Sequence, residues 1–195
     1  MSVEEFVLQN RIKKLGRLFA LMVDNYNTMG AWWKNIPLGK EAFELMKRLP
    51  ERVEGEFDSP AEKAGLLEQM LGQMVEKASP RFCIEVRRYI CVLAPDDTHN
   101  AARLGMLRDY LDLDYPMDDF CSKYHEHLRF DPVERTPRWE ELAYDVEREC
   151  DRRLDETPRG MGFCFAYWSV NRQVLAEHGV DWKSPAAMNR GVMFD

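Results

Sequence analysis

One stripe of large apolar residues near the N-terminus constrains the fold of this chain more than any other sequence feature. Between positions 8 and 33, such residues recur at alternating intervals of four and three: Leu8, Ile12, Leu15, Phe19, Met22, Tyr26, Met29 and Trp33. This spacing places all eight on one side of an α-helix. Neighbouring apolar residues make that side broader than the seam of a two-stranded coiled coil. The pattern predicts a long helix, the spine of a helical bundle, ending at Asn35-Ile36-Pro37.

Similar periodicity predicts further helices along the chain. Ser-Pro or Thr-Pro dipeptides begin at positions 59, 79, 136, 157 and 184, each before an apolar run, and this pair is a typical helix start. Segment 82–93 is ambiguous, because its first residues alternate as in a strand although the whole segment fits a helix. We favour an all-α, single-domain bundle of about seven to eight helices. The alternative is an α+β fold with one short strand near 82–93.

Length and composition are those of a globular protein with its own core. A chain of 195 residues can bury roughly 70% of the surface that its unfolded form exposes, so folding requires neither disulfides nor a metal. Apolar residues make up 45% of the chain and charged residues 31%, as is usual for globular domains. We therefore expect a single domain over 1–195, with the polar segment 50–58 as the candidate for a soft boundary.

The charge is acidic overall but unevenly distributed. The formal net charge is −7; residues 1–50 carry 8 Lys/Arg against 5 Asp/Glu, or +3, which leaves −10 for the remainder. An acidic body repels a phosphate backbone, so nucleic-acid binding is not expected. The N-terminus has early glutamates and lacks the apolar core of a signal peptide. No stretch approaches the roughly 20 apolar residues that cross a bilayer, and we expect a cytoplasmic protein without membrane attachment.

The cysteines indicate reduced thiols. There are five, an odd number, and they are widely spaced and form no CxxC pair: Cys83, Cys91, Cys121, Cys150 and Cys164. This pattern supports neither a zinc ribbon nor a redox motif. We expect buried thiols and no disulfide.

A metal site is the alternative to a protein without cofactors. If segment 117–128 is helical throughout, His125 and His127 lie about 200° apart and cannot bind one ion together. Cys121 and His125 are one turn apart, however, and other ligands are available nearby or elsewhere in the chain. The alternative ligand set for a divalent metal ion is His99, Cys121, His125, His127 and Asp118.

An aromatic run opens the last long helix. Cys164 lies among Phe163, Phe165, Tyr167 and Trp168, near the free backbone N–H groups of a helix start that can activate a thiol. Cys164, Tyr167 and Trp168 are therefore the candidate residues of an aromatic pocket. Aromatic residues at helical spacing belong more often to a core, and we favour that interpretation.

No recurrent catalytic spacing occurs in the chain. The phosphate-binding loop, the dinucleotide fingerprint and the nucleophile elbow are absent from the sequence. We predict a non-enzymatic interaction or regulatory protein that binds a protein partner or itself, through the first helix where the bundle leaves its stripe uncovered. The alternatives are a metal-dependent hydrolase of a helical-bundle type that uses the His and Asp ligands, and a small-ligand binder that uses the aromatic pocket.

Overall fold

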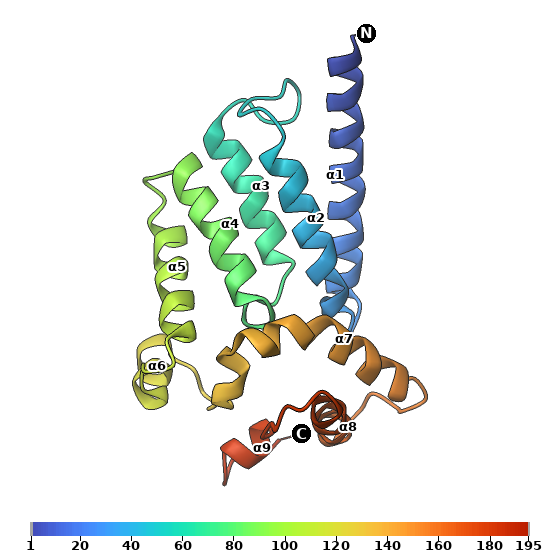
Figure 1. Ribbon diagram of the computed structural model, residues 1–195, viewed down its shortest axis with the longest axis vertical. Helices are drawn as coiled ribbons and strands as arrows, with labels where there is room; N and C mark the ends of the chain where they lie inside the picture. Colours follow the sequence, from blue (N-terminus) through green and yellow to red (C-terminus); the bar gives the residue numbers. More distant parts are fainter. Residues whose placement is uncertain (1, 195) are drawn as a thin grey trace. The chain divides into compact units, whose positions relative to one another are not determined.

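The computed structural model describes residues 2–194, and all of their regular elements are helical. The α-helices are α1 (Val3–Asn27), α2 (Asn35–Lys47), α3 (Pro60–Gly72), α4 (Pro80–Leu93), α5 (Thr98–Leu111), α6 (Met117–Tyr124), α7 (Pro137–Arg153), α8 (Phe163–Glu177) and α9 (Pro185–Met188). Short 3-10 turns occur at Trp32–Lys34, Glu76–Ala78 and Pro132–Arg135. The predicted all-α architecture with a long N-terminal helix is confirmed (Figure 1). Segment 82–93 lies inside α4, so the strand alternative is wrong.

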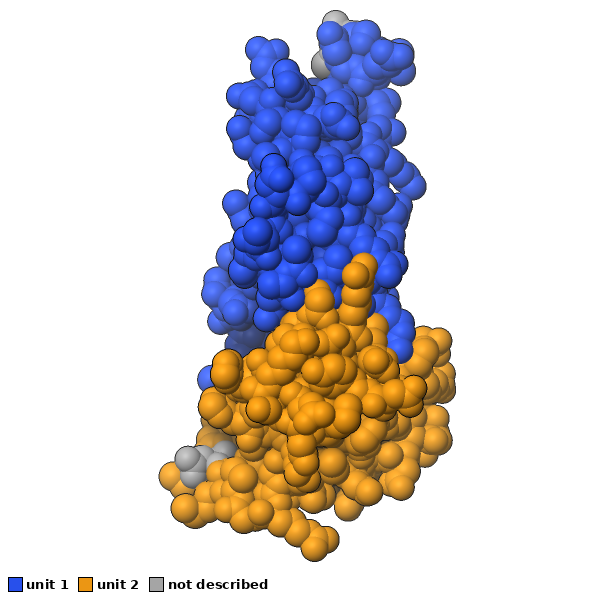
Figure 2. All heavy atoms as spheres, turned by 90° about the vertical axis from the view of Figure 1, so that its left-hand side faces the viewer, with its two compact units in different colours: residues 1–104 blue, residues 105–195 orange. Residues whose placement is uncertain are grey.

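The chain forms two compact units, residues 1–104 and residues 105–195, which Figure 2 colours separately. We refer to them as unit 1 and unit 2. The division falls within α5. The polar segment 50–58, where the sequence suggests a soft boundary, lies inside unit 1 and connects α2 to α3.

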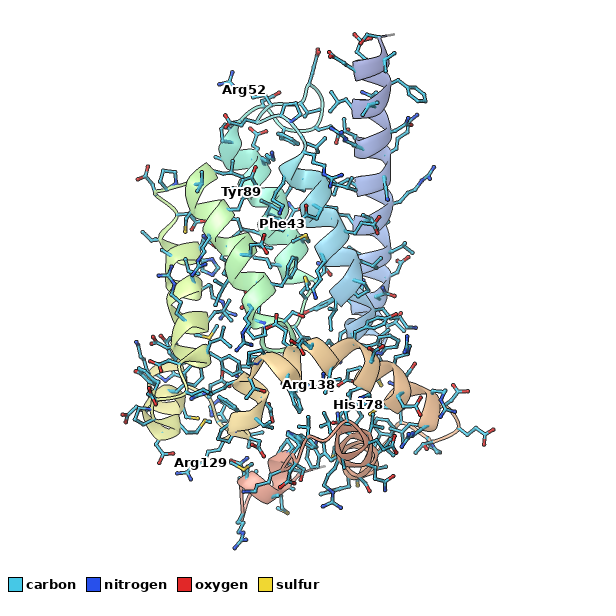
Figure 3. The ribbon with its side chains drawn as sticks, viewed as in Figure 1. Phe43, Arg52, Tyr89, Arg129, Arg138 and His178 are labelled. Carbon is cyan, nitrogen blue, oxygen red and sulfur yellow. The ribbon has the colours of Figure 1, made fainter. Side chains whose placement is uncertain are left out.

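Unit 1 contains four neighbouring helices, because each of α1, α2 and α3 packs against the next helix in the chain (Figure 1). Their facing sides bury large apolar residues, including Met22, Met46, Leu67 and Ile90. Phe43 on α2 packs edge-on against Tyr89 on α4, with ring centroids 5.8 Å apart (Figure 3). Aromatic pairs in this geometry stabilise a core beyond the area they bury.

A buried asparagine joins α1, α2 and the end of α3. Asn35 is fully buried and donates its amide hydrogens to the carbonyl oxygens of Met22 and Gln73, both at 2.8 Å. Its own amide oxygen accepts a hydrogen bond from Asn25 at 2.9 Å. Gln73 lies at the end of α3, where backbone carbonyl groups lack partners within their own helix, and Asn35 supplies a hydrogen-bond donor there.

The first helix ends earlier than its apolar stripe predicts. The chain turns after α1, and Gly30 adopts a left-handed conformation with φ of 76°, which glycine adopts readily. The helix then restarts at α2 with Pro37 in its first turn, where the missing N–H has no helical acceptor. Consequently Trp33 is buried from a separate turn, whereas Tyr26 and Met29 are exposed.

Three of the five Ser/Thr-Pro sites begin helices with a side-chain cap. Ser59, Thr136 and Ser184 each accept a hydrogen bond from a backbone N–H of the following turn. Ser79 precedes α4 without such a bond. No helix starts at the 157–158 pair, because α8 begins five residues later, at Phe163.

Unit 2 has its own apolar core, in which α7 packs against α8. Their inner sides contribute Leu142, Val146 and Val174, and the segment after α8 adds Trp182. The indole N–H of Trp182 donates to the Glu134 carboxylate at 2.8 Å, so this large ring is buried without an unpaired donor.

Two further predictions concern the covalent state of the chain and the lengths of its helices. All five cysteines are free thiols, as expected, but only Cys83 and Cys150 are buried, and the other three are partly exposed. Within residues 2–194, no helix combines the length and the apolar character needed to cross a bilayer.

Candidate functional site

The first turns of α1 extend past the end of α2 (Figure 1). The Arg11 guanidinium donates to the carbonyl oxygen of Arg48, the residue that follows α2, at 3.2 Å. Before this point three apolar residues are exposed: Val3 is 80% exposed, Phe6 53% and Val7 39%. Adjacent exposed apolar residues of this size are typical of a binding surface.

The extended end of α1 has its own stabilising cap. The N–H of Glu5 donates to the Ser2 hydroxyl at 3.1 Å, and the Glu5 carboxylate accepts from the N–H of Ser2 at 2.6 Å. This reciprocal capping box satisfies two backbone groups that a helix start otherwise leaves to water. The exposed apolar side chains are therefore presented from a capped helix.

A groove of about 610 Å³ lies between this end of α1 and the turn that follows α2. Val3 and Val7 supply apolar wall, and Glu4 and Arg11 supply charges. The opposite wall comes from the turn that contains Pro50. We call the groove and its exposed helix end the α1 groove.

Of the four charged residues that line the α1 groove, Glu4 and Arg11 lie on the same side of the helix, while Glu5 belongs to the capping box and Arg48 follows α2. Glu4 and Arg11 are seven positions apart, which is about 20° short of two full turns. Glu4 forms no ion pair with another residue of the described chain. Arg11 uses one N–H for the Arg48 carbonyl, and a guanidinium has five N–H donors. Both charges are therefore available to a binding partner.

A second polar feature lies between α7 and α8. The Tyr167 hydroxyl donates to a carboxylate oxygen of Glu147 and accepts a hydrogen bond from Asn171 at 2.9 Å. Asn171 is only 3% exposed, and its amide oxygen has no hydrogen-bond partner. We call these three residues the α7–α8 cluster.

Burial dominates the protonation of this cluster. It raises the pKa of Glu147 to about 7, and the negative charge of Asp151 contributes in the same direction, against the lowering effect of the Tyr167 hydrogen bond. Burial also raises the pKa of Tyr167 well above its usual value. One turn along α7, burial raises the pKa of the Cys150 thiol to about 12. A carboxyl group that titrates near neutral pH is the unusual property of this cluster.

The candidate pocket residues lie on the first half of α8 and are partly exposed. Tyr167 belongs to the α7–α8 cluster, whereas Trp168 packs edge-on against Phe165 at 5.5 Å and Phe194 at 5.0 Å between ring centroids. Cys164 is also only partly covered. The fully buried part of α8 is its second half, at Val174 and Leu175. The aromatic run is therefore less buried than expected for residues of a core. The first half of α8 is apolar on several sides, and α7 covers only one of them.

The candidate histidine ligands do not lie on a common helix. Helix α6 ends at Tyr124, and His125 follows in a left-handed conformation with φ of 55°. His127 lies in the turn beyond. The assumption that both histidines continue α6 is wrong, because the helix ends before them at a left-handed residue.

The remaining metal candidates have other neighbours. Asp118 pairs with Arg129 at 2.6 Å, and His99 lies 3.8 Å from a carboxylate oxygen of Glu68. The Cys121 thiol lies 3.9 Å from a backbone carbonyl oxygen. Within residues 2–194, no three His, Cys, Asp or Glu side chains are grouped so that they could hold a metal ion. The structure therefore does not bring the candidate ligands together.

Sequence reasoning missed two residues of the α7–α8 cluster. Glu147 directly follows Val146 and precedes Cys150 by three positions, so a helical wheel places it at the margin of the apolar side of α7. Asn171 lies one turn after Tyr167 on α8. The sequence shows that both polar residues lie beside an apolar stripe. It does not show that α7 packs against α8, which is what brings them together.

The comparisons with known proteins add no relative to these observations. No protein family model, no curated protein and no solved structure shows significant similarity to this chain.

Proposed function

We propose that the protein works by binding rather than by catalysis, and that it associates with a second copy of itself through the α1 groove. The observation that carries the proposal is the exposed apolar end of α1, where an acidic and a basic residue lie on one face of the helix with apolar residues between them. Val3 and Val7 supply the apolar contact, and Glu4 and Arg11 supply the charges.

An antiparallel arrangement makes these features self-complementary. When two copies of α1 cross antiparallel with residue 4 opposite residue 11, Glu4 of each copy faces Arg11 of the other. A twofold axis then relates two identical ion pairs, as in the usual symmetric dimer. In the same register, Val7 lies near the axis and meets Val7 and Leu8 of the second copy. The apolar contact is therefore central and the charges lie at its two ends.

A parallel arrangement of the two helices is unfavourable. It would place Glu4 beside Glu4 and Arg11 beside Arg11, and like charges at the flanks of paired helices oppose association. The charge order along α1 therefore selects the antiparallel pair.

The contact is short, so association depends on concentration. The paired segment covers about ten residues, or about 15 Å of helix, and buries less than the roughly 1,200 Å² of a stable interface. We expect a dimer that forms in the micromolar to millimolar range, at about 10 µM to 1 mM.

Sedimentation equilibrium over that range tests the proposal. Each single charge reversal, Glu4→Arg or Arg11→Glu, places like charges opposite each other and should weaken association about tenfold or more. The double variant E4R/R11E restores opposite charges and should recover dimerisation. The matched control is Lys13→Glu, an exposed charge on another side of α1. A wild-type protein that stays monomeric throughout, or a double variant as weak as the singles, contradicts the proposed self-association.

A further inference from the structure

We propose that the α7–α8 cluster is a proton-responsive latch, which holds α8 on α7 while Glu147 carries a proton and weakens when Glu147 ionises. This regulatory device is independent of the α1 groove. It stands on the hydrogen-bonded chain from Glu147 on α7 through Tyr167 to Asn171 on α8. That chain connects the two helices beside the apolar core of unit 2, where Glu147 and Tyr167 are half-buried and Asn171 is buried.

No cation compensates an ionised Glu147. Within the described chain, no Lys or Arg forms an ion pair with it, and the titratable groups that act on it or are acted on by it are Cys150 and Asp151 on α7 and Tyr167 on α8. Asp151 adds negative charge, although Arg159 binds it at 2.7 Å. Ionisation therefore places an uncompensated charge at the interface, which is costly in a low-dielectric environment.

The unpartnered oxygen of Asn171 gives the protonated state a second hydrogen-bond pattern. With Glu147 ionised, the Tyr167 hydroxyl donates to the carboxylate and Asn171 donates to Tyr167. With Glu147 protonated by a proton from solvent, its O–H donates to Tyr167. The Tyr167 O–H then donates to the Asn171 amide oxygen after that amide turns by half a rotation. Both patterns contain two hydrogen bonds, but only the second places no charge in the interface.

The latch operates close to neutral pH. Burial raises the pKa of Glu147 to about 7 while α8 is in place, whereas a solvent-exposed glutamate titrates near ~4.3. The closed state thus binds the proton more tightly than any state that releases Glu147 to water. Opening becomes easier as the pH rises from about 4.3 to about 7, and this dependence follows from linkage.

Opening would expose apolar surface. The inner side of α8 carries Val174 and Leu175, both buried against the core of unit 2. The outer side already exposes part of the aromatic run at Phe165. Ionisation of Glu147 therefore couples a small change in pH to the accessibility of an apolar helix.

Hydrogen–deuterium exchange of the full chain tests the latch. Protection of α8 amides, corrected for the intrinsic pH dependence of exchange, is measured from about pH 5.5 to about pH 8.5. In the wild type it should fall about tenfold over this range. In Glu147→Gln, which keeps the side-chain shape without the charge, protection should not change with pH. Glu141→Gln, an exposed carboxylate on the same helix, is the matched control and should behave as the wild type does.

A second measurement separates the latch from a general effect on folding. In a carboxyl-carbon NMR titration, the Glu147 resonance should shift with a midpoint near 7, and the Tyr167→Phe variant should raise this midpoint further. A Glu147 midpoint near the ~4.3 of free glutamate overturns the proposal. So does α8 protection whose pH dependence persists in Glu147→Gln.

Discussion

Glu76 in unit 1 and Glu147 in unit 2 are both carboxylates at helix interfaces, but their hydrogen-bond partners differ in charge. The Glu76 side chain is 9% exposed and accepts two hydrogen bonds from Arg87, at 2.7 and 2.5 Å, and another from Arg103. Glu147 accepts one from the neutral hydroxyl of Tyr167. One interface therefore contains a compensated charge and the other a charge without compensation.

The charge of its hydrogen-bond partners determines whether a carboxylate at a helix interface can respond to pH. The guanidinium of Arg87 also donates to Asn100 at 2.9 Å, and Asn100 donates back to the Arg87 carbonyl at 3.0 Å. Such a closed network holds its members in one arrangement, and removing one member leaves the others buried without partners. A carboxylate beside neutral groups has a simpler alternative, which is to bind a proton. We therefore assign a structural role to the unit 1 network and a responsive one to the α7–α8 cluster.

The largest expected effect comes from breaking the network in unit 1. Arg87→Ala leaves the Glu76 carboxylate and the Asn100 amide buried without their main partner, which should lower the free energy of unfolding by about 3–5 kcal/mol. Urea denaturation followed by circular dichroism measures this loss. The control Arg88→Ala, at the exposed neighbouring position, should stay within about 0.5 kcal/mol of the wild type. A loss below about 1 kcal/mol would show that the network is not a structural unit.

The second largest expected effect is a dependence of the stability on pH, caused by Glu147. The folded state raises the pKa of Glu147 to about 7, so its proton stabilises the fold below about pH 4.3 and this stabilisation is lost as the pH rises through 7. The full linkage amounts to about 4 kcal/mol, and the partial exposure of Glu147 reduces it to about 1–2 kcal/mol. Urea denaturation of the full chain at about pH 5 and pH 8 should show this decrease in the free energy of unfolding in the wild type and not in Glu147→Gln. If the free energy of unfolding falls equally in both proteins, Glu147 is not the group that makes the stability depend on pH.

The smallest expected effect comes from removing the Tyr167 hydroxyl, the neutral partner of Glu147. Tyr167→Phe removes the hydroxyl that binds both Glu147 and Asn171, and should cost about 1 kcal/mol at pH 8. The loss should be smaller at pH 5, where Glu147 has no charge to stabilise. Thermal or urea unfolding at both pH values measures it. Tyr26→Phe, which removes an exposed hydroxyl on α1, is the control and should change the stability little at either pH.

Much of the fold follows from local patterns. The 4-3 spacing of the first segment, the Ser-Pro cap at 59 and the Thr-Pro cap at 136 are properties of short stretches, and helices were found there. The end of α1 was not predictable in this way, because the stripe continues to Trp33 while the backbone turns at Gly30. Whether an apolar residue continues a helix or enters the core from a new one depends on tertiary contacts.

The candidate sites were harder to predict than the helices. Within the metal hypothesis, the pairing of Cys121 with His125 depended on His125 continuing α6, and the left-handed conformation of His125 removed that premise. Tyr167 was identified as a candidate from its aromatic neighbours, but its function in the cluster depends on Glu147 and Asn171. No sequence pattern shows which helix packs against which, so the partners of a polar residue become known only from the fold.

The attachment of α1 through Asn35 affects how the groove binds. Asn35 fixes α1 near its C-terminal end, at Met22 and Asn25, and the last polar contact toward the other end is that of Arg11 with Arg48. Beyond Arg11, the displacement of the helix end grows with distance from this last polar contact. Val3 and Val7 therefore sample a wider range of positions before association than after it, and dimerisation costs conformational entropy. A substitution outside the groove that holds this end of α1 more firmly would reduce that cost and tighten binding without adding a contact between the two copies.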